Sequence, residues 1–298
     1  VFPDDDQLFC GMIGTHGVKM ANAAVNECDV LFLVGARVGD RAVKTPLALE
    51  KTTKIIHIDI DPAEIGKNIG ADLPLVGDAK LVLQQMTELA KPMKHDEWIA
   101  HIKTLGGERK YVEPAKGTVN PRVFIDRLAK KMPANVTVVA DVGQNQIWTC
   151  TEYKFRKEGR LLTSGGMGTM GYSVPAAIGA KMADDSRATV AICGDGAFQM
   201  SFMELATAVQ FGVDIKVVVM TNNRLGMVRE LQTNGYHDRQ TAVFLDGSPD
   251  FIKLAEAYGI PAMRVYDDDT MEKGIEMLAE HKGICLVEVV VDKDMPTL

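Results

Sequence analysis

One stretch decides the fold: Ala188–Gly226, with the sequence ATVAICGDGAFQMSFMELATAVQFGVDIKVVVMTNNRLG. It contains two apolar runs, 189–193 and 215–220, whose length and β-branched residues are typical of buried parallel strands. Between them, Ser201–Phe211 carries apolar side chains at helical spacing. Such a strand–helix–strand unit has a right-handed crossover, which places both strand ends on one edge of the sheet. The stretch therefore predicts an α/β fold with a parallel sheet.

A polar side chain follows each of these two strands. Asp195 stands in Gly194-Asp195-Gly196, and Asn222 follows the second strand 27 positions later. Ligands of open α/β folds sit outside the carboxyl ends of the strands, so we expect these side chains to converge there. Carboxylate and amide oxygens suit Mg²⁺, and glycines let backbone N–H groups face a diphosphate. A tight turn whose aspartate merely caps the next helix is the alternative.

The motif Gly194-Asp195-Gly196, twenty-five further residues and then Asn222-Asn223 resembles the thiamine diphosphate motif. Three neighbouring segments, 142–146 (VGQNQ), 163–172 (TSGGMGTMGY) and 225–228 (LGMV), are similar to the catalytic subunit of acetolactate synthase. The similarity extends along nearly the whole chain, which corresponds to the latter half of that family's subunit. The resemblance implies two Rossmann-like parallel-sheet domains, a partial central domain and a thiamine diphosphate-binding domain.

The resemblance also implies a set of cofactor-binding residues. These are Gln144, Asn145, Gly168, Thr169, Met170, Asp195, Gly196, Ala197, Asn222, Asn223, Arg224, Leu225, Gly226 and Met227. Within this set the Mg²⁺ ligands would be Asp195, Asn222 and the backbone oxygen of Arg224, since an arginine side chain cannot coordinate a cation.

Three further positions have roles in the family. Met170 would wedge beneath the cofactor and bend it, although core packing also explains a methionine there. Asn145 stands where the family usually has a histidine, so we expect no proton transfer from it; Gln144 and Asn145 could also simply cap the following helix. Leu231 stands where biosynthetic members often carry a tryptophan that lines the acceptor pocket.

By this resemblance, the activity joins two 2-oxo acids in branched-chain amino acid biosynthesis. Pyruvate loses CO₂, and the remaining two-carbon unit passes to a second pyruvate or to 2-oxobutanoate. The expected assembly is a homodimer or tetramer of the full-length subunit, with a regulatory subunit as a further partner. Alternatives are another thiamine diphosphate-dependent decarboxylase, oxidase or carboligase, or a non-catalytic nucleotide-binding module.

No catalytic residue is assigned within this chain. In the family the activating glutamate belongs to a pyrimidine-binding domain that is N-terminal to everything in this sequence. The chain starts abruptly, without an initiator methionine, which predicts a fragment. We therefore expect the chain alone to be inactive.

Residues 1–91 predict part of a central domain, truncated at its N-terminus. Strands are expected at 30–35, 54–59 and 75–76, each followed by a polar or glycine-rich turn. In the family such turns hold FAD, which implies Gly35, Ala36, Arg37, Val38, Gly39, Asp59, Ile60, Asp78 and Ala79 as flavin contacts. Ordinary strand-end turns are the alternative, and the sequence departs from the family at Ile13 and Gly39.

The remaining boundaries follow from composition. Residues 92–118 are polar and contain proline and paired glycines, which predicts a linker with a short amphipathic segment around Trp98. Residues 119–298 predict a complete diphosphate-binding domain with a six-stranded parallel sheet.

Overall composition excludes several classes of protein. With 46% hydrophobic and 24% charged residues, the chain is neither disordered nor a membrane protein. Its net charge of −7, with acids and bases interspersed, argues against nucleic acid as a partner. Five scattered cysteines indicate reduced thiols, buried at Cys193 and Cys285, and a cytoplasmic location. The six histidines, without ligand spacing, are expected at the surface.

Overall fold

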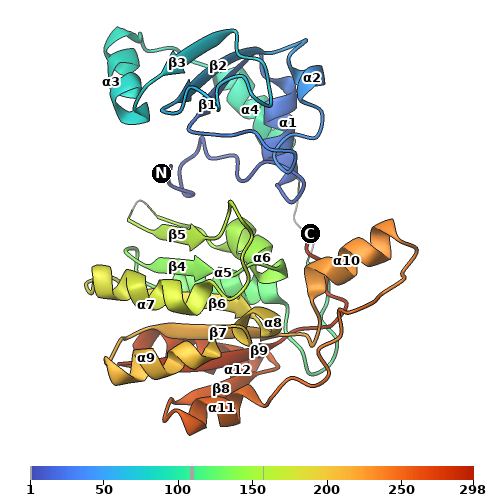
Figure 1. Ribbon diagram of the computed structural model, residues 1–298. Helices are drawn as coiled ribbons and strands as arrows, with labels where there is room; N and C mark the ends of the chain where they lie inside the picture. The colour runs from blue at the N-terminus through green and yellow to red at the C-terminus, as the bar shows by residue number, and fades with distance from the viewer. Residues whose placement is uncertain (1, 108–110, 157) are drawn as a thin grey trace. The chain divides into compact units, whose positions relative to one another are not determined.

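The computed structural model describes residues 2–107, 111–156 and 158–298 (Figure 1). The chain divides into two compact units, Leu8–Arg109 and Val1–Gln7 together with Lys110–Leu298. Each unit is built on its own parallel sheet, of three strands in the first and six in the second. The predicted α/β class with two parallel sheets is confirmed.

The larger unit has the six-stranded parallel sheet that the sequence predicts. Its strand order is β5-β4-β6-β7-β9-β8. The strands are β4 (Thr137–Ala140), β5 (Arg160–Thr163), β6 (Thr189–Gly194), β7 (Lys216–Thr221), β8 (Ala262–Val265) and β9 (Cys285–Val290). Every residue of β4 and β7 is buried, because helices cover both faces of the sheet.

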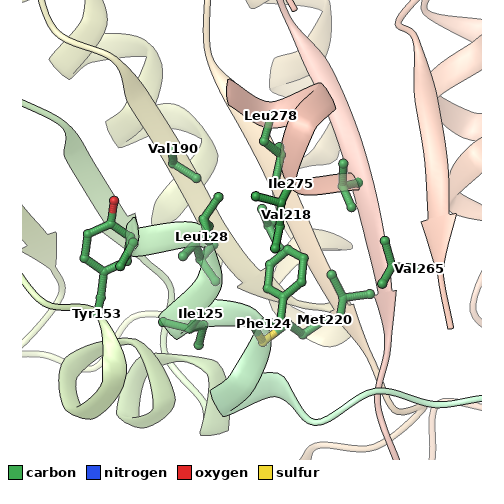
Figure 2. Close-up of a cluster of buried hydrophobic side chains, with 14 of the residues drawn as sticks. Phe124, Ile125, Leu128, Tyr153, Val190, Val218, Met220, Val265, Ile275 and Leu278 are labelled. Atoms are coloured by element: carbon green, nitrogen blue, oxygen red, sulfur yellow. The ribbon is translucent and has the colours of Figure 1, made fainter. Parts of the chain in front are cut away.

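Alternate residues of each strand enter two separate cores. Helices α5 (Pro121–Lys131), α6 (Gln144–Glu152) and α12 (Asp268–Glu280) pack with Val190 and Val218 on one face. Figure 2 shows this core, with Phe124, Ile125 and Leu128 of α5 among the strand side chains. On the other face, α7 (Ser173–Ala183), α9 (Leu205–Gln210) and α11 (Phe251–Ala257) pack with Cys193 and Val219. Cys193 and Cys285 are both buried, as predicted.

The strand order places a topological switch beside β4. The chain passes from β4 to β5 on one side and returns to β6 on the other. In doubly wound folds, ligands bind where the order reverses, outside the carboxyl ends of these strands. Gly194 of β6 pairs with Met220 of β7, so Asp195 and Asn222 follow at neighbouring positions of that same edge. The convergence expected from the sequence is therefore built into the sheet register.

The helix predicted over Ser201–Phe211 is present as the 3₁₀ helix η1 (Phe202–Glu204), which runs directly into α9. A further short helix that the sequence analysis did not identify, α8 (Asp195–Phe198), precedes it. Ser201, with φ −144°, separates α8 from η1. A further helix, α10 (Gly226–Gly235), follows the Asn222-Asn223 turn, and the sequence analysis did not identify it.

The smaller unit has the sheet order β1-β2-β3, formed by β1 (Val30–Val34), β2 (Lys54–Asp59) and β3 (Leu73–Val76). Its helices are α1 (Lys19–Glu27), α2 (Pro46–Leu49), α3 (Ala79–Leu89) and α4 (Asp96–Thr104). Helix α4 contacts α1 and lies inside the segment expected to be a linker, around Trp98. The predicted domain limits stay predictions.

His57 corrects the expectation that all histidines lie at the surface. It is on the central strand β2 and is only 1% exposed, with no hydrogen-bond partner for either ring nitrogen within the described chain. In this strand, Ile55, His57 and Asp59 alternate with residues of the opposite face. A histidine at an inward position of a buried strand cannot be recognised from ligand spacing.

A search of the described helices for a membrane-spanning segment found none of sufficient length and apolar character.

Candidate functional site

A cavity of about 100 Å³ lies at the carboxyl ends of β4, β6 and β7. It is lined by Val142, Gly143, Gln144, Asn145, Trp148, Met170, Gly194, Asp195, Gly196, Ala197, Met220, Asn222, Arg224, Leu225, Gly226, Met227, Val228 and Val291. Among the residues predicted to bind the cofactor, Gly168, Thr169 and Asn223 are not part of this lining, and all the others are.

Asp195 is a buried carboxylate that lines the cavity and is only 1% exposed. Its Oδ1 accepts a hydrogen bond from Gly196 N (2.8 Å), and its Oδ2 accepts from Asn222 N (3.2 Å) and Asn223 N (2.6 Å). Desolvation by burial raises the pKa of Asp195 to about 6, against the lowering effect of these backbone donors. The recorded partners of this carboxylate in the described chain are neutral, so the site has an uncompensated negative charge.

Asn222 lies beside this carboxylate with its amide held at both ends. Its Oδ1 accepts from Arg224 N (3.1 Å), and its Nδ2 donates to Gln144 Oε1 (3.2 Å). The guanidinium of Arg224 bonds to Asp246 Oδ1 and stacks 4.7 Å from the ring centre of Phe244. The Arg224 side chain is thus held by Asp246 and Phe244. The backbone oxygen of Arg224 is the group that the family resemblance assigns to the cation.

Two glycines in the lining have no room for a side chain. A Cβ on Gly226 would lie 1.9 Å from Gln144 Oε1 and 2.6 Å from its Cδ. A Cβ on Gly196 would lie 2.7 Å from Leu225 Cδ2. A side chain at either position would therefore displace Gln144 or Leu225, two residues that line the cavity, so glycine keeps this packing in place.

Asn145 does not present a free donor to the cavity. Its Nδ2 donates to the backbone oxygens of Asp141 (2.8 Å) and Ile192 (3.2 Å), at the ends of β4 and β6. Asn145 thus ties the two strands together across the switch point.

Asp141, which sequence reasoning did not assign to the site, holds the glycine-rich loop in place. It is fully buried, and its carboxylate accepts from the backbone N–H groups of Val142 (2.8 Å), Gly171 (3.0 Å) and Ser173 (2.7 Å). It therefore fastens the end of loop 164–171 and the start of α7 to the end of β4. The sequence feature that could have identified Asp141 is its position directly after a buried strand.

The same loop contains Gly168, Thr169 and Met170. The hydroxyl of Ser164 accepts from Thr169 N (3.0 Å), and Gly168 has φ +65°, a backbone conformation that glycine adopts readily. Met170 lines the cavity, as the wedge hypothesis requires, and it also packs against the core, as the alternative requires.

Leu231 is exposed on α10 and does not line the cavity, whereas Val228, one turn earlier on the same helix, does. The lining residues that the sequence analysis did not assign are Val142, Gly143, Trp148, Gly194, Met220, Val228 and Val291. Gly143, Gly194 and Val228 are adjacent to a predicted residue in the sequence, and Val142 and Met220 are two positions from one. Trp148, four positions after Gln144 on α6, could have been found from helical spacing.

In the smaller unit, the residues assigned to FAD follow the three parallel strands: Gly35, Ala36, Arg37, Val38 and Gly39 after β1, Asp59 and Ile60 at the end of β2, and Asp78 and Ala79 after β3. They therefore share one edge of the sheet. Asp78 also caps α3, its Oδ1 accepting from Leu81 N. A separate cavity of about 290 Å³ is lined by Ile13, Gly14, Thr15, Asn22, Val25, Asn26, Ala42, Val43, Lys44 and Thr45, none of them in the flavin set.

The residues of the larger unit fit a diphosphate held by a divalent cation. The donor set combines a carboxylate with an amide oxygen, as Mg²⁺ prefers, and leaves positions for phosphate oxygens. The described chain has no cluster of three His, Cys, Asp or Glu side chains suited to a metal ion. A cation at Asp195 would therefore depend on amide, backbone and ligand oxygens.

Comparison with known proteins agrees with this geometry. The family described as "Thiamine pyrophosphate enzyme, C-terminal TPP binding domain" matches residues 141–289, and "Thiamine pyrophosphate enzyme, central domain" matches residues 1–86. The chain is 39% identical to the "Probable acetolactate synthase large subunit" of Methanocaldococcus jannaschii, over 98% of this chain and 51% of that protein.

Two further relatives give a similar result. The "Acetolactate synthase large subunit" of Lactococcus lactis is 36% identical over 98% of this chain and 51% of its own length. The "Acetolactate synthase isozyme 2 large subunit" of Escherichia coli is 35% identical over 97% and 52%. The chain thus spans about half the length of these curated relatives. With the two domain matches and the cavity at the switch point, this chain belongs to the thiamine pyrophosphate enzyme family.

Proposed function

We propose that this chain is the cofactor-anchoring part of an acetolactate synthase catalytic subunit, which joins pyruvate to a second 2-oxo acid with loss of CO₂. The observation that carries the proposal is the buried Asp195 beside Asn222 in a glycine-walled cavity. The names of the three relatives support the reaction. When bound, thiamine diphosphate supplies the carbanion chemistry at its thiazolium carbon.

The residues of this chain bind and orient the cofactor. Asp195 and the Asn222 amide oxygen would hold Mg²⁺, together with the backbone oxygen of Arg224. Gly196 and Gly226 line the cavity that would take the diphosphate. Met170, on the loop fastened by Asp141, would contact the cofactor.

The chain leaves proton transfer to another part of the enzyme. Asp195 is the single carboxylate among the described lining residues, and it is committed to the cation. An acid that activates the cofactor would then come from outside this chain. On this basis, we propose that the chain by itself is inactive. The words "large subunit" in the names of the relatives support the further proposal that the working enzyme is a homodimer or tetramer of the full-length subunit with a regulatory subunit.

Two finer parts of the proposal concern substrate and flavin. Leu231 is proposed to border the acceptor pocket of the assembled enzyme, beyond the cavity seen here, and to select between pyruvate and 2-oxobutanoate. FAD is proposed to bind at the shared edge of β1, β2 and β3. The convergence of the three strand ends supports this flavin site.

Thermal unfolding in the presence of ligands tests the cofactor assignment. Thiamine diphosphate with Mg²⁺ should stabilise the chain, by about 2.7 kcal/mol at a hundredfold excess over Kd. NAD should not stabilise it, and Asp195→Ala should remove the effect because the two phosphates would lose the charged ligand of their cation. Equal stabilisation of the wild type and Asp195→Ala would refute the proposed site.

A further inference from the structure

Gln144 connects the proposed cation ligand with the C-terminal segment of the chain. It is the first residue of α6 and is 4% exposed. Its Oε1 accepts from Asn222 Nδ2 (3.2 Å), and its Nε2 donates to Met295 O (2.9 Å), Glu230 Oε2 (3.2 Å) and Thr297 Oγ1 (3.2 Å). The two ends of one amide therefore contact two different parts of the structure.

The partners on the nitrogen side determine which way this amide faces. The Met295 carbonyl and the Glu230 carboxylate both accept hydrogen bonds here through their oxygen lone pairs. Glu230 is itself held, because its carboxylate accepts from Thr297 N (3.2 and 3.3 Å) and from the Thr297 hydroxyl. A Gln144 side chain turned the other way would place its oxygen against these acceptors, which is unfavourable in a buried site.

The orientation of the Gln144 amide in turn determines the orientation of the Asn222 amide. With the Gln144 oxygen facing it, Asn222 must present its nitrogen to Gln144, which leaves its oxygen on the opposite side, where it accepts from Arg224 N. Only the oxygen of an amide ligates Mg²⁺. The fit is close, because a single Cβ on Gly226 would lie 1.9 Å from Gln144 Oε1.

We propose that Glu230, acting through Gln144, sets the orientation of the Asn222 amide, so that its oxygen rather than its nitrogen is presented to the cation. Gln144 and Glu230 are then positioning residues, and the segment around Met295 and Thr297 belongs to the support of the cation site. This inference rests on the proposed cation site at Asp195 and Asn222.

A double-mutant cycle with Asn222→Asp separates this role from a general effect on folding. A carboxylate has two equivalent oxygens, so its orientation needs no amide partner. Gln144→Leu should therefore weaken Mn²⁺ binding at least tenfold in the wild-type background and less than threefold in the Asn222→Asp background. Mn²⁺ substitutes for Mg²⁺ at oxygen ligands, and water proton relaxation measures its binding even when it is weak.

The isosteric change Glu230→Gln provides a second test that keeps the packing. It replaces an acceptor by an amide that can face Gln144 with either end, so a several-fold weaker binding of Mn²⁺ is expected, again only where Asn222 is intact. Equal losses in both backgrounds would overturn the relay, because a structural defect does not depend on the residue at 222. If wild-type Mn²⁺ binding does not depend on Asp195, the proposed cation site itself fails.

Discussion

Asp195 is a buried carboxyl whose ionisation lowers the stability of the native chain. Burial raises the pKa of this carboxyl to about 6 from 3.8, so the native chain binds this proton more tightly than the unfolded chain does. The contribution of Asp195 to the free energy of unfolding is therefore greatest below pH 4. It is lost as the pH rises from about 4 to about 6, and the loss reaches about 3 kcal/mol.

Because the contribution of Asp195 to the free energy of unfolding should fall as the pH rises, the assignment can be tested on the metal-free chain. Between pH 4.5 and 7, the unfolding free energy of the wild type should fall relative to that of Asp195→Asn, which does not titrate. Mg²⁺ with diphosphate should restore stability to the wild type alone, most strongly at pH 7. Chemical denaturation at a series of pH values measures the difference, and parallel pH profiles for the two proteins would contradict the assignment.

Gly226 gives a second residue-level prediction. Its alanine variant should bind thiamine diphosphate and Mg²⁺ at least tenfold more weakly, a loss of about 1.4 kcal/mol, because the new Cβ displaces Gln144 from Asn222. Gly235, at the other end of α10, is the matched control, since a Cβ there meets no atom within 4 Å. Calorimetric titration should show a loss for Gly226→Ala and none for Gly235→Ala; similar affinities in both variants would argue against a crowded wall.

At the scale of elements, the parallel strands could be read closely from the sequence. The predicted limits of β2 match the structure, and those of β6 and β7 differ by no more than one residue at either end. Long runs of β-branched residues indicate these strands reliably, because a strand covered on both faces needs an apolar side chain at nearly every position. Asp195 and Asn222 could be predicted as site residues because they stand directly after two of these strands, β6 and β7.

The short helices and the supporting contacts could not be read in the same way. The apolar spacing after β6 predicts the helical stretch formed by η1 and α9, but no such spacing identified the short helix α8, which begins at Asp195, or helix α10. The partners of Gln144 lie 78 to 153 positions away in the sequence, from Asn222 to Thr297, and no local pattern reports such contacts.

The junction of β4, the glycine-rich loop and α7 depends on one side chain, Asp141. Asp141→Asn keeps one acceptor oxygen but turns an NH₂ group toward at least one backbone N–H that the carboxylate now accepts from. We expect a loss of about 1–3 kcal/mol in unfolding free energy and faster amide exchange at Gly171 and Ser173.

The matched control for Asp141→Asn lies just beyond the opposite end of α7. Asp185 is exposed and pairs with Lys181 Nζ at 3.1 Å, so Asp185→Asn should change stability by less than about 1 kcal/mol. Urea denaturation and hydrogen exchange resolve the two effects. Unchanged exchange at Gly171 and Ser173 in Asp141→Asn would show that the loop is held by other contacts.

At the scale of the whole molecule, the chain corresponds to about half of each curated relative, and its described cavity contains one carboxylate. A complete reaction needs an acid to activate the cofactor and a separate group to hold the cation, because one buried side chain cannot stay ionised for Mg²⁺ and also carry a proton. The proposed function therefore requires an activating acid other than Asp195.

We therefore expect the purified chain, supplied with pyruvate, thiamine diphosphate, Mg²⁺ and FAD, to form no measurable acetolactate. Fusing it to the N-terminal half of the Methanocaldococcus jannaschii relative should restore product formation, since 39% identity across this chain favours compatible interfaces. Asp195→Ala in the fusion should abolish the activity again by releasing the cation. The intact relative is the positive control in the same acetolactate assay. Turnover by the isolated chain comparable to that of the relative would contradict the argument, because it would require an activating acid within these 298 residues.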